Sequence, residues 1–434
     1  MTLTLIHIAF ALAAGLLMTR VFKALHFNFP DVTVYLITGL LIGPYGLGRL
    51  GVSGLGFSSM EAVKALEMIS TVALGFIAFS IGNEFKISQL KGIGKQATVI
   101  GILQALAATL VVDLVLLTVA LLSKGRLSAS AAITLGAIAA ATAPAATLMV
   151  VRQYKAQGKV TSLLLPIVAI DDAVGLVIFA ISFGVAQALL AGSISVVALV
   201  INPMIEIFAS IILGSVLGWI LTKLEELFFS NTNRLSLTIA FVLVTIAFSR
   251  LTFRIGAVTV SFSSLLVCMM LGTVLCNFCP RSGDIMHRAD GWTSPLNVLF
   301  FVLSGAELDL GVISNLFVVV IGLLYIVARS AGKYYGARFS ASITGCDHNT
   351  CKYLGYTLLP QAGVALGMSA QAVSLGSKDG TIVRNIVLFS VLVYELFGPS
   401  ITRWALTQTG DIVSVPKEKT SHERFDTPKE HRKK

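Results

Sequence analysis

Charged residues are scarce in this chain. Asp, Glu, Lys and Arg make up 12% of its residues, whereas 56% of the residues are hydrophobic. Because a soluble globular domain has about 25% charged residues, this composition excludes an ordinary soluble domain and predicts a polytopic membrane protein. The first residues also lack the basic region and small-residue cleavage site of a signal peptide, so we expect the first apolar segment to remain as a membrane span.

Cysteine is also rare, and its pattern argues against a structural metal site. Cys276 and Cys279 are followed by His287, which resembles half of a zinc site, but the five cysteines form no second Cys-x-x-Cys motif. A structural zinc ion needs four ligands. We therefore expect reduced thiols, no cofactor and no resident metal.

The net charge of +10 is not concentrated on one surface. Basic residues lie between apolar segments instead of on a folded domain, so we expect no nucleic-acid partner. Seven of the 32 Lys and Arg residues lie within 417–434. We expect residues 411–434 to form a short basic tail in the cytosol, where such charges attract anionic lipid headgroups.

Long apolar segments recur along the chain. A membrane-spanning helix needs about 20 mostly apolar residues, and segments separated by Gly, Pro and charge clusters predict about thirteen such helices. The predicted spans are 2–19, 31–48, 66–84, 97–122, 128–151, 161–189, 195–222, 235–250, 257–277, 294–308, 314–337, 354–375 and 382–407. We therefore expect one all-α transmembrane domain over residues 1–410.

Lys and Arg are unevenly divided between the two sets of loops. With the N-terminus outside, the internal loops hold 14 of them and the external loops 8, without counting the tail. Because cytosolic loops are richer in Lys and Arg, this pattern predicts an external N-terminus and a cytosolic C-terminus.

Two adjacent aspartates lie in the middle of an apolar segment. Asp171 and Asp172 fall within the predicted span 161–189, where each carboxylate costs about 2.5–3.5 kcal/mol even on a lenient insertion scale. They differ by about 100° around a helix, so both cannot face one partner. One can pair with a fixed cation while the other faces a cavity. This pattern indicates proton or cation transport, with structural ion pairs as the alternative.

Arg329 is the expected counterion of this pair because it lies well inside the span 314–337. Lys333, one turn further along, is expected to extend to the cytosolic interface. Four further polar residues are predicted within the membrane, with packing or transport roles left open: Gln104, Asp113, Glu206 and Glu395.

Two predicted spans are interrupted by proline. Pro144 follows Thr142 in one span, and Pro360 precedes Gln361 in the other. A proline within a helix frees a backbone carbonyl, which the membrane tolerates only where it is buried in protein or lines a cavity. These spans are predicted to be broken helices beside an ion site, with simple kinks as the alternative.

A short motif occurs at the ends of two spans. Gly82-Asn-Glu84-Phe-Lys-Ile87 and Gly305-Ala-Glu307-Leu-Asp-Leu310 share the pattern Gly-x-Glu-apolar-x-apolar, seven spans apart. Because seven is odd, the two copies run in opposite directions. This predicts an inverted repeat of spans 1–6 and 8–13 joined by span 7, as is typical of secondary transporters.

The chain resembles the monovalent cation:proton antiporter-2 family, which includes Kef-type potassium and NapA-type sodium/proton antiporters. The resemblance covers nearly all of residues 1–410. It is carried by Phe29 to Pro44, Phe79-Ser-Ile-Gly-Asn-Glu84, Ile170-Asp-Asp-Ala173, Ala328-Arg-Ser-Ala-Gly-Lys-Tyr-Tyr-Gly336 and Gly398-Pro399.

This resemblance implies an NhaA-like antiporter fold with inverted repeats and two crossing broken helices. It implies a homodimer in a prokaryotic inner or plasma membrane, with a scaffold of spans 1–3 and 7–10 and a moving core of spans 4–6 and 11–13. It assigns Asp172 as the carrier and Asp171 as the partner of the basic residue in span 11. The exchange would be electrogenic and would use an elevator movement.

Two departures from the family pattern affect these expectations. Ala143 follows Thr142, where many sodium-selective relatives have an aspartate, so cation binding would use Asp172, Thr142, carbonyls and water. This leaves Na⁺ and K⁺ both open. The Kef-type nucleotide-binding domain is not expected, because no Gly-x-Gly-x-x-Gly motif follows a strand.

The expected function is Na⁺/H⁺ antiport, with K⁺/H⁺ antiport or sodium-coupled symport of an organic anion as alternatives. An enzyme is not expected: an intramembrane aspartyl protease needs its aspartates on two facing helices, whereas these are adjacent on one. A channel is also disfavoured, since no Thr-Val-Gly-Tyr-Gly filter motif occurs.

Overall fold

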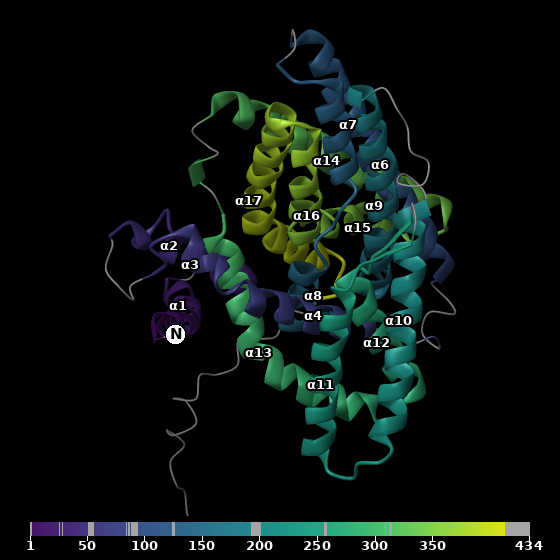
Figure 1. Ribbon diagram of the computed structural model, residues 1–434. Helices are drawn as coiled ribbons and strands as arrows, with labels where there is room; N and C mark the ends of the chain where they lie inside the picture. The colour runs from purple at the N-terminus through teal and green to yellow at the C-terminus, as the bar shows by residue number, and fades with distance from the viewer. Residues whose placement is uncertain are drawn as a thin grey trace, which may run out of the picture.

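The computed structural model describes most of the 434-residue chain (Figure 1). The described residues are 2–25, 27, 29–50, 56–83, 85, 87, 94–123, 126–191, 201–255, 258–308, 310–311 and 315–412. Most of them are helical, as expected of an all-α membrane protein. Most of the expected basic tail, including every Lys and Arg of 417–434, and the motif residues Glu84 and Asp309 lie outside these ranges.

The helices of the first half are α1 (Thr2–Ala24), α2 (Asp31–Ile42), η1 (Leu47–Leu50), α3 (Met60–Lys64), α4 (Glu67–Asn83), α6 (Gly94–Leu122), α7 (Ala129–Ala139), α8 (Pro144–Gln153) and α9 (Lys159–Ala191). Those of the second half are α10 (Asn202–Glu225), α11 (Asn231–Ser249), α12 (Ser264–Phe278), α13 (Ser282–Ala306), α14 (Leu316–Ile343), α15 (His348–Thr357), α16 (Gly363–Gln371), η4 (Ala372–Leu375) and α17 (Ser377–Gln408). Within the described ranges, nine helical segments are long and apolar enough to cross a membrane, and α4 and α12 are shorter apolar helices.

The predicted starts of spans 257–277 and 294–308 differ from the structure. Phe253–Ile255 (β1) and Val258–Val260 (β2) form a two-stranded antiparallel sheet in which Phe253 pairs with Val260. The predicted span 257–277 therefore begins too early, because Val258–Val260 is a strand of β-branched residues that precedes α12. Conversely, α13 begins well before the predicted residue 294, since its first turns are polar but still helical.

The long helices pack in two groups. In the first group, α6, α7, α9 and α14 pack together, and α15, α16 and α17 pack against them. In the second group, α1, α2 and α13 pack together, and α4, α10, α11 and α12 complete it. Figure 1 shows α10, α11 and α12 gathered at one end of the view and α6, α7 and α14 at the other. Helix α8 contacts both groups, through α9 and α17 on one side and α2 and α4 on the other.

The C-terminal end of α17 is fastened to the start of α9. After Gly410, whose φ of 78° suits glycine, the Asp411 carboxylate accepts hydrogen bonds from the Thr161 backbone N–H at 2.7 Å and the Thr161 hydroxyl at 2.8 Å. The Asp411 carbonyl also accepts from Gln157 N–H at 2.8 Å. A carboxylate at a helix N-terminus stabilises that helix, so α9 and α17 are joined at this end.

Glycines allow the helices of the second group to approach closely. A Cβ on Gly39 of α2 would lie 1.9 Å from the Val302 carbonyl oxygen of α13, and one on Gly305 would lie 2.1 Å from the Leu36 carbonyl oxygen. The backbones of α2 and α13 therefore meet at these glycines without intervening side chains, as is common at membrane helix interfaces.

We predict that Gly305→Ala lowers the free energy of unfolding in detergent by about 1–3 kcal/mol, because the added methyl group displaces α2. Gly291→Ala is the matched control on the same helix, since a Cβ there meets no atom within 4 Å. This control should be neutral or stabilising by up to about 1 kcal/mol. Equal losses in the two variants would contradict the close approach of α2 and α13.

Candidate ion-binding site

Two interrupted helices cross near the middle of the bundle. Helix α7 ends at Ala139 and α8 begins at Pro144, whereas α15 ends at Thr357 and α16 begins at Gly363. The two connecting segments are hydrogen-bonded to each other, because Ala143 N–H donates to the Pro360 carbonyl at 2.8 Å. Pro144 stands at the first position of α8, where a missing N–H costs no helical hydrogen bond.

Arg329 of α14 lies beside backbone carbonyls at both helix breaks. Its guanidinium donates from Nε to the Ala139 carbonyl at 3.0 Å, from Nη2 to the Ala141 carbonyl at 2.6 Å and from Nη1 to the Leu359 carbonyl at 2.7 Å. The side chain is fully buried, with 0% exposure. A helix C-terminus carries a partial negative charge and carbonyls without intrahelical partners. Arg329 therefore donates hydrogen bonds to carbonyls at both helix breaks.

Lys333 lies one turn further along α14 and is also fully buried. Its ammonium donates to the Ala140 carbonyl at 2.5 Å and to the Thr142 hydroxyl at 2.8 Å. It also forms an ion pair with Asp171, at 2.9 Å from Nζ to Oδ2. Lys333 therefore connects the broken segment of α7–α8 to the acidic centre of α9.

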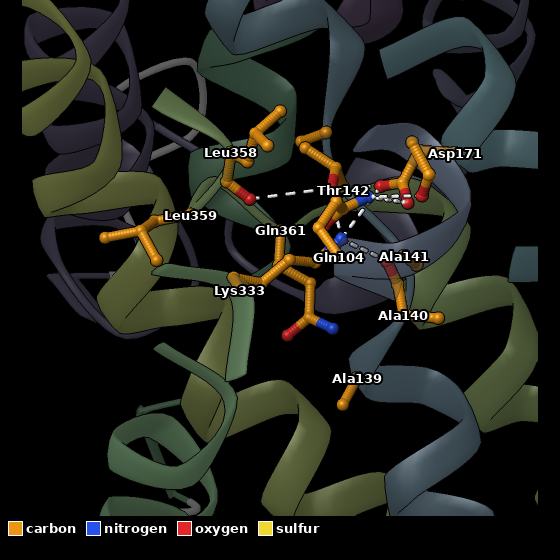
Figure 2. A network of polar contacts seen from close by, with 12 residues as sticks. Gln104, Ala139, Ala140, Ala141, Thr142, Asp171, Lys333, Leu358, Leu359 and Gln361 are labelled. Carbon is orange, nitrogen blue, oxygen red and sulfur yellow. Dashed lines mark hydrogen bonds and ion pairs between the residues drawn. The ribbon is translucent and has the colours of Figure 1, made fainter. Parts of the chain in front are cut away.

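The Asp171 carboxylate accepts hydrogen bonds from three side chains. Oδ1 accepts from the Gln104 amide of α6 at 2.5 Å, and Oδ2 accepts from the Thr142 hydroxyl and from Lys333. In Figure 2, Gln104, Thr142 and Asp171 gather on one side of the crossing, and Leu358 and Leu359 lie on the other. This carboxylate, with 0% exposure, is held by groups from three separate elements.

A family model described as sodium/hydrogen exchanger, transmembrane, matches residues 8–408. The chain belongs to the sodium/hydrogen exchanger family. This membership confirms the expected cation:proton antiporter family and points to a transporter.

Solved structures show the same fold. The exchanger is similar to the sodium proton antiporter MjNhaP1 from Methanocaldococcus jannaschii at pH 8, with 18% identity and a TM-score of 0.65 over 95% of this chain and 99% of that chain. It is also similar to an electron-microscopy structure of MjNhaP1, with 16% identity and a TM-score of 0.72 over 95% of this chain and 98% of that chain. No curated protein matches the exchanger.

The counterion of Asp171 in this exchanger is Lys333, whereas the sequence pattern favoured Arg329. The difference arises from the length of α14, which continues to Ile343, beyond the predicted end of the span at residue 337. Lys333 therefore lies ten residues before the helix end, and its side chain is fully buried. Arg329 is still central to the site, where its hydrogen-bond partners among the described residues are three backbone carbonyls.

Two glutamines belong to this site. Gln361, expected as part of a broken helix, donates to the Ile138 carbonyl at 3.0 Å and to the Tyr325 hydroxyl at 3.0 Å, and accepts from Ser390 at 3.2 Å. Gln104 binds Asp171, which sequence reasoning did not assign. An isolated polar residue in an apolar span is the only sequence signal for it, and this signal does not identify a partner.

The other acids predicted within the membrane lie on α6, α9, α10 and α17. Asp172 follows Asp171 in α9, but its side chain lies outside the described part of the structure. Asp113 of α6 faces the Cα of Gly136 in α7, and Glu206 of α10 accepts a hydrogen bond from Ser261 at 3.1 Å. Glu395 is buried in α17, with 6% exposure. The described contacts of these three acids do not include Asp171 or Lys333.

We predict that Asp171 and Lys333 are energetically coupled. Asp171→Asn or Lys333→Met alone should lower the free energy of unfolding by about 3–5 kcal/mol, because each leaves one charge buried without its partner. The double variant should lose less than the sum of the two single losses. Chemical unfolding of the purified exchanger in detergent measures all three changes, and additive losses would refute the pairing.

We also predict that Arg329→Ala lowers the free energy of unfolding by about 2 kcal/mol or more, because three carbonyls lose a charged donor. Arg338→Ala is the control on the same helix, since Arg338 is exposed and contacts only Tyr334 among its described hydrogen bonds, at 3.4 Å. Its unfolding free energy should change by less than about 0.5 kcal/mol. A similar loss in both variants would show that Arg329 does not support the crossing.

Proposed function

We propose that this exchanger moves cytosolic Na⁺ and external protons in opposite directions through one site, with Asp172 as the carrier. The observation that carries the proposal is that Asp171 accepts hydrogen bonds from Gln104, Thr142 and Lys333. A carboxylate with three donors and no exposed surface is held in place. The neighbouring carboxylate is then the one that takes up and releases ions.

The charges of the site support this division. Arg329 and Lys333 bring two positive charges into the buried crossing, and Asp171 brings one negative charge. Each helix break presents one C-terminal and one N-terminal end, whose partial charges oppose one another. An unbalanced positive charge in a buried site is costly. The second carboxylate, Asp172, supplies the balancing negative charge. A proton or a cation binds to Asp172 in turn during transport.

Competition for one carboxylate couples the two fluxes. A proton bound to Asp172 removes the charge that a cation needs, and a bound cation lowers the affinity for the proton. Thr142 remains part of the proposed cation-binding set with Asp171 and Asp172. Because its hydroxyl already donates to Asp171 and accepts from Lys333, Thr142 must exchange one of these contacts to reach a cation.

We also propose the wider architecture that the family resemblance implies. The chain would form about thirteen spans in two inverted repeats, a homodimer, and an N-out, C-in orientation in a prokaryotic membrane. The two packing groups of helices support a scaffold built from the second group and a moving core built from the first. An elevator movement of the core would then carry Asp172 from one side to the other.

We predict that Asp172→Asn reduces exchange in proteoliposomes to the level of empty vesicles, because the amide can hold neither a proton nor a cation in exchange. The assay is dequenching of a pH-sensitive dye on addition of Na⁺, K⁺ or Li⁺, with and without a clamped membrane potential. Glu226→Gln is the control, since its side chain is 57% exposed and pairs with Lys223 outside the site. Undiminished exchange in Asp172→Asn would refute the assignment, and the three cations reveal the preference that Ala143 leaves open.

A further inference from the structure

An ion pair connects α8 to α13 across the two groups of helices. Arg152, in the last turn of α8, lies 2.7 Å from Asp290 of α13, measured from Nη1 to Oδ1. Ser80 of α4 donates to the same carboxylate oxygen at 3.3 Å. The pair is partly exposed, with 26% exposure for the Arg152 side chain and 39% for that of Asp290. It therefore bridges a helix that contacts the ion site and a helix of the second group.

The pair lies in the wall of a large cavity. The cavity has a volume of about 880 Å³ and is lined by α8, α9, α13 and the turn between α8 and α9. Its lining is exposed at Lys155 and Ser162 and buried at Leu148 and Pro166. Pro166 precedes Asp171 by five residues of α9, or about 7.5 Å of helix rise. The cavity thus extends from the surface to buried residues of α9, the helix that carries Asp171.

The α13 wall of this cavity is polar. Asp290, Ser294 and Asn297 line it at spacings of four and three residues, so they share one face of α13. Asn297 is 9% exposed, and its Oδ1 has no hydrogen-bond partner among the residues that the structure describes. A polar wall of this kind suits a hydrated cation.

A second contact joins the end of α8 to the second group. The Gln153 side-chain oxygen accepts a hydrogen bond from the Asp31 backbone N–H at the start of α2, at 2.8 Å. Consecutive side chains of α8, Arg152 and Gln153, therefore hold helices of the second group at the same end of the bundle. Relative movement of the two groups would have to break both contacts.

We propose that the Arg152–Asp290 ion pair is a latch that stabilises the arrangement in which this cavity is open beside the α8–α9 turn. Release of the pair lets α8 and α9 move relative to α13. This inference rests on the proposed alternating access for its role in transport, but the latch itself concerns a conformational equilibrium. A partly exposed pair shifts such an equilibrium by about two- to fivefold.

Thiol labelling of the full-length protein in proteoliposomes tests the latch. Ser162→Cys places a thiol at the exposed end of the cavity, in a background with Cys346→Ser and Cys351→Ser, since the other three cysteines are buried. The rate of labelling by a membrane-impermeant maleimide should fall about two- to fivefold in Arg152→Gln and in Asp290→Asn. The charge-exchanged variant Arg152→Asp with Asp290→Arg should restore the rate.

Lys155→Gln is the matched control, because it removes a positive charge from the same cavity and leaves the pair intact. Its labelling rate should stay at the starting value. Unchanged labelling in Arg152→Gln and Asp290→Asn, or an equal fall in Lys155→Gln, would overturn the latch. Thermal unfolding of each variant identifies a loss caused by misfolding.

Transport assays on the same proteoliposomes separate the latch from the proposed function. In Arg152→Gln the apparent KM for Na⁺ should rise on the side of the α8–α9 turn and fall on the opposite side, and a general structural defect would not produce opposite changes. If the starting protein shows no exchange while labelling still responds, the proposed function fails and the latch stands. If it exchanges and labelling does not respond, only the latch fails.

Discussion

Two positive side chains from one turn of α14 neutralise the carbonyl ends of two broken helices. Arg329 reaches the end of α7 and the break after α15, and Lys333 reaches the same break in α7–α8 together with Asp171. Backbone groups without partners are costly in a membrane, so the interruption at Pro144 depends on these cations. The positions of Thr142 and Asp171 depend in turn on that interruption.

This arrangement explains how a polar site can exist inside such an apolar helix bundle. An extended backbone segment brings polar groups to the membrane interior, but only where other polar groups satisfy it. Here the amides of Gln104 and Gln361, the hydroxyl of Thr142 and the two cations form one network around the crossing. Small residues in the breaks, such as Ala140 and Ala141, leave room for that network.

Sequence reasoning found the breaks and the acids but not all of their partners. Pro144 and Pro360 identify the interruptions because proline has a local backbone effect, and Asp171 stands out because a charge in lipid is costly. Hydropathy falls before α14 ends, so the sequence places Lys333 at the membrane interface, whereas its side chain is buried. The strands β1 and β2 and the polar start of α13 were missed because short or polar elements give no membrane signal. The contact between Gln104 and Asp171 joins residues 67 positions apart, which no local pattern encodes.

The attachment of Asp411 to the start of α9 couples the end of the described chain to that helix. The last described turn of the chain is bound to the same helix that carries Asp171, through Thr161 and Gln157. The last described turn of the chain is therefore fixed to the start of the helix that carries Asp171. Under the elevator movement proposed above, a fluorophore attached to this last described turn would move with α9, and one attached to α1 would serve as the stationary reference.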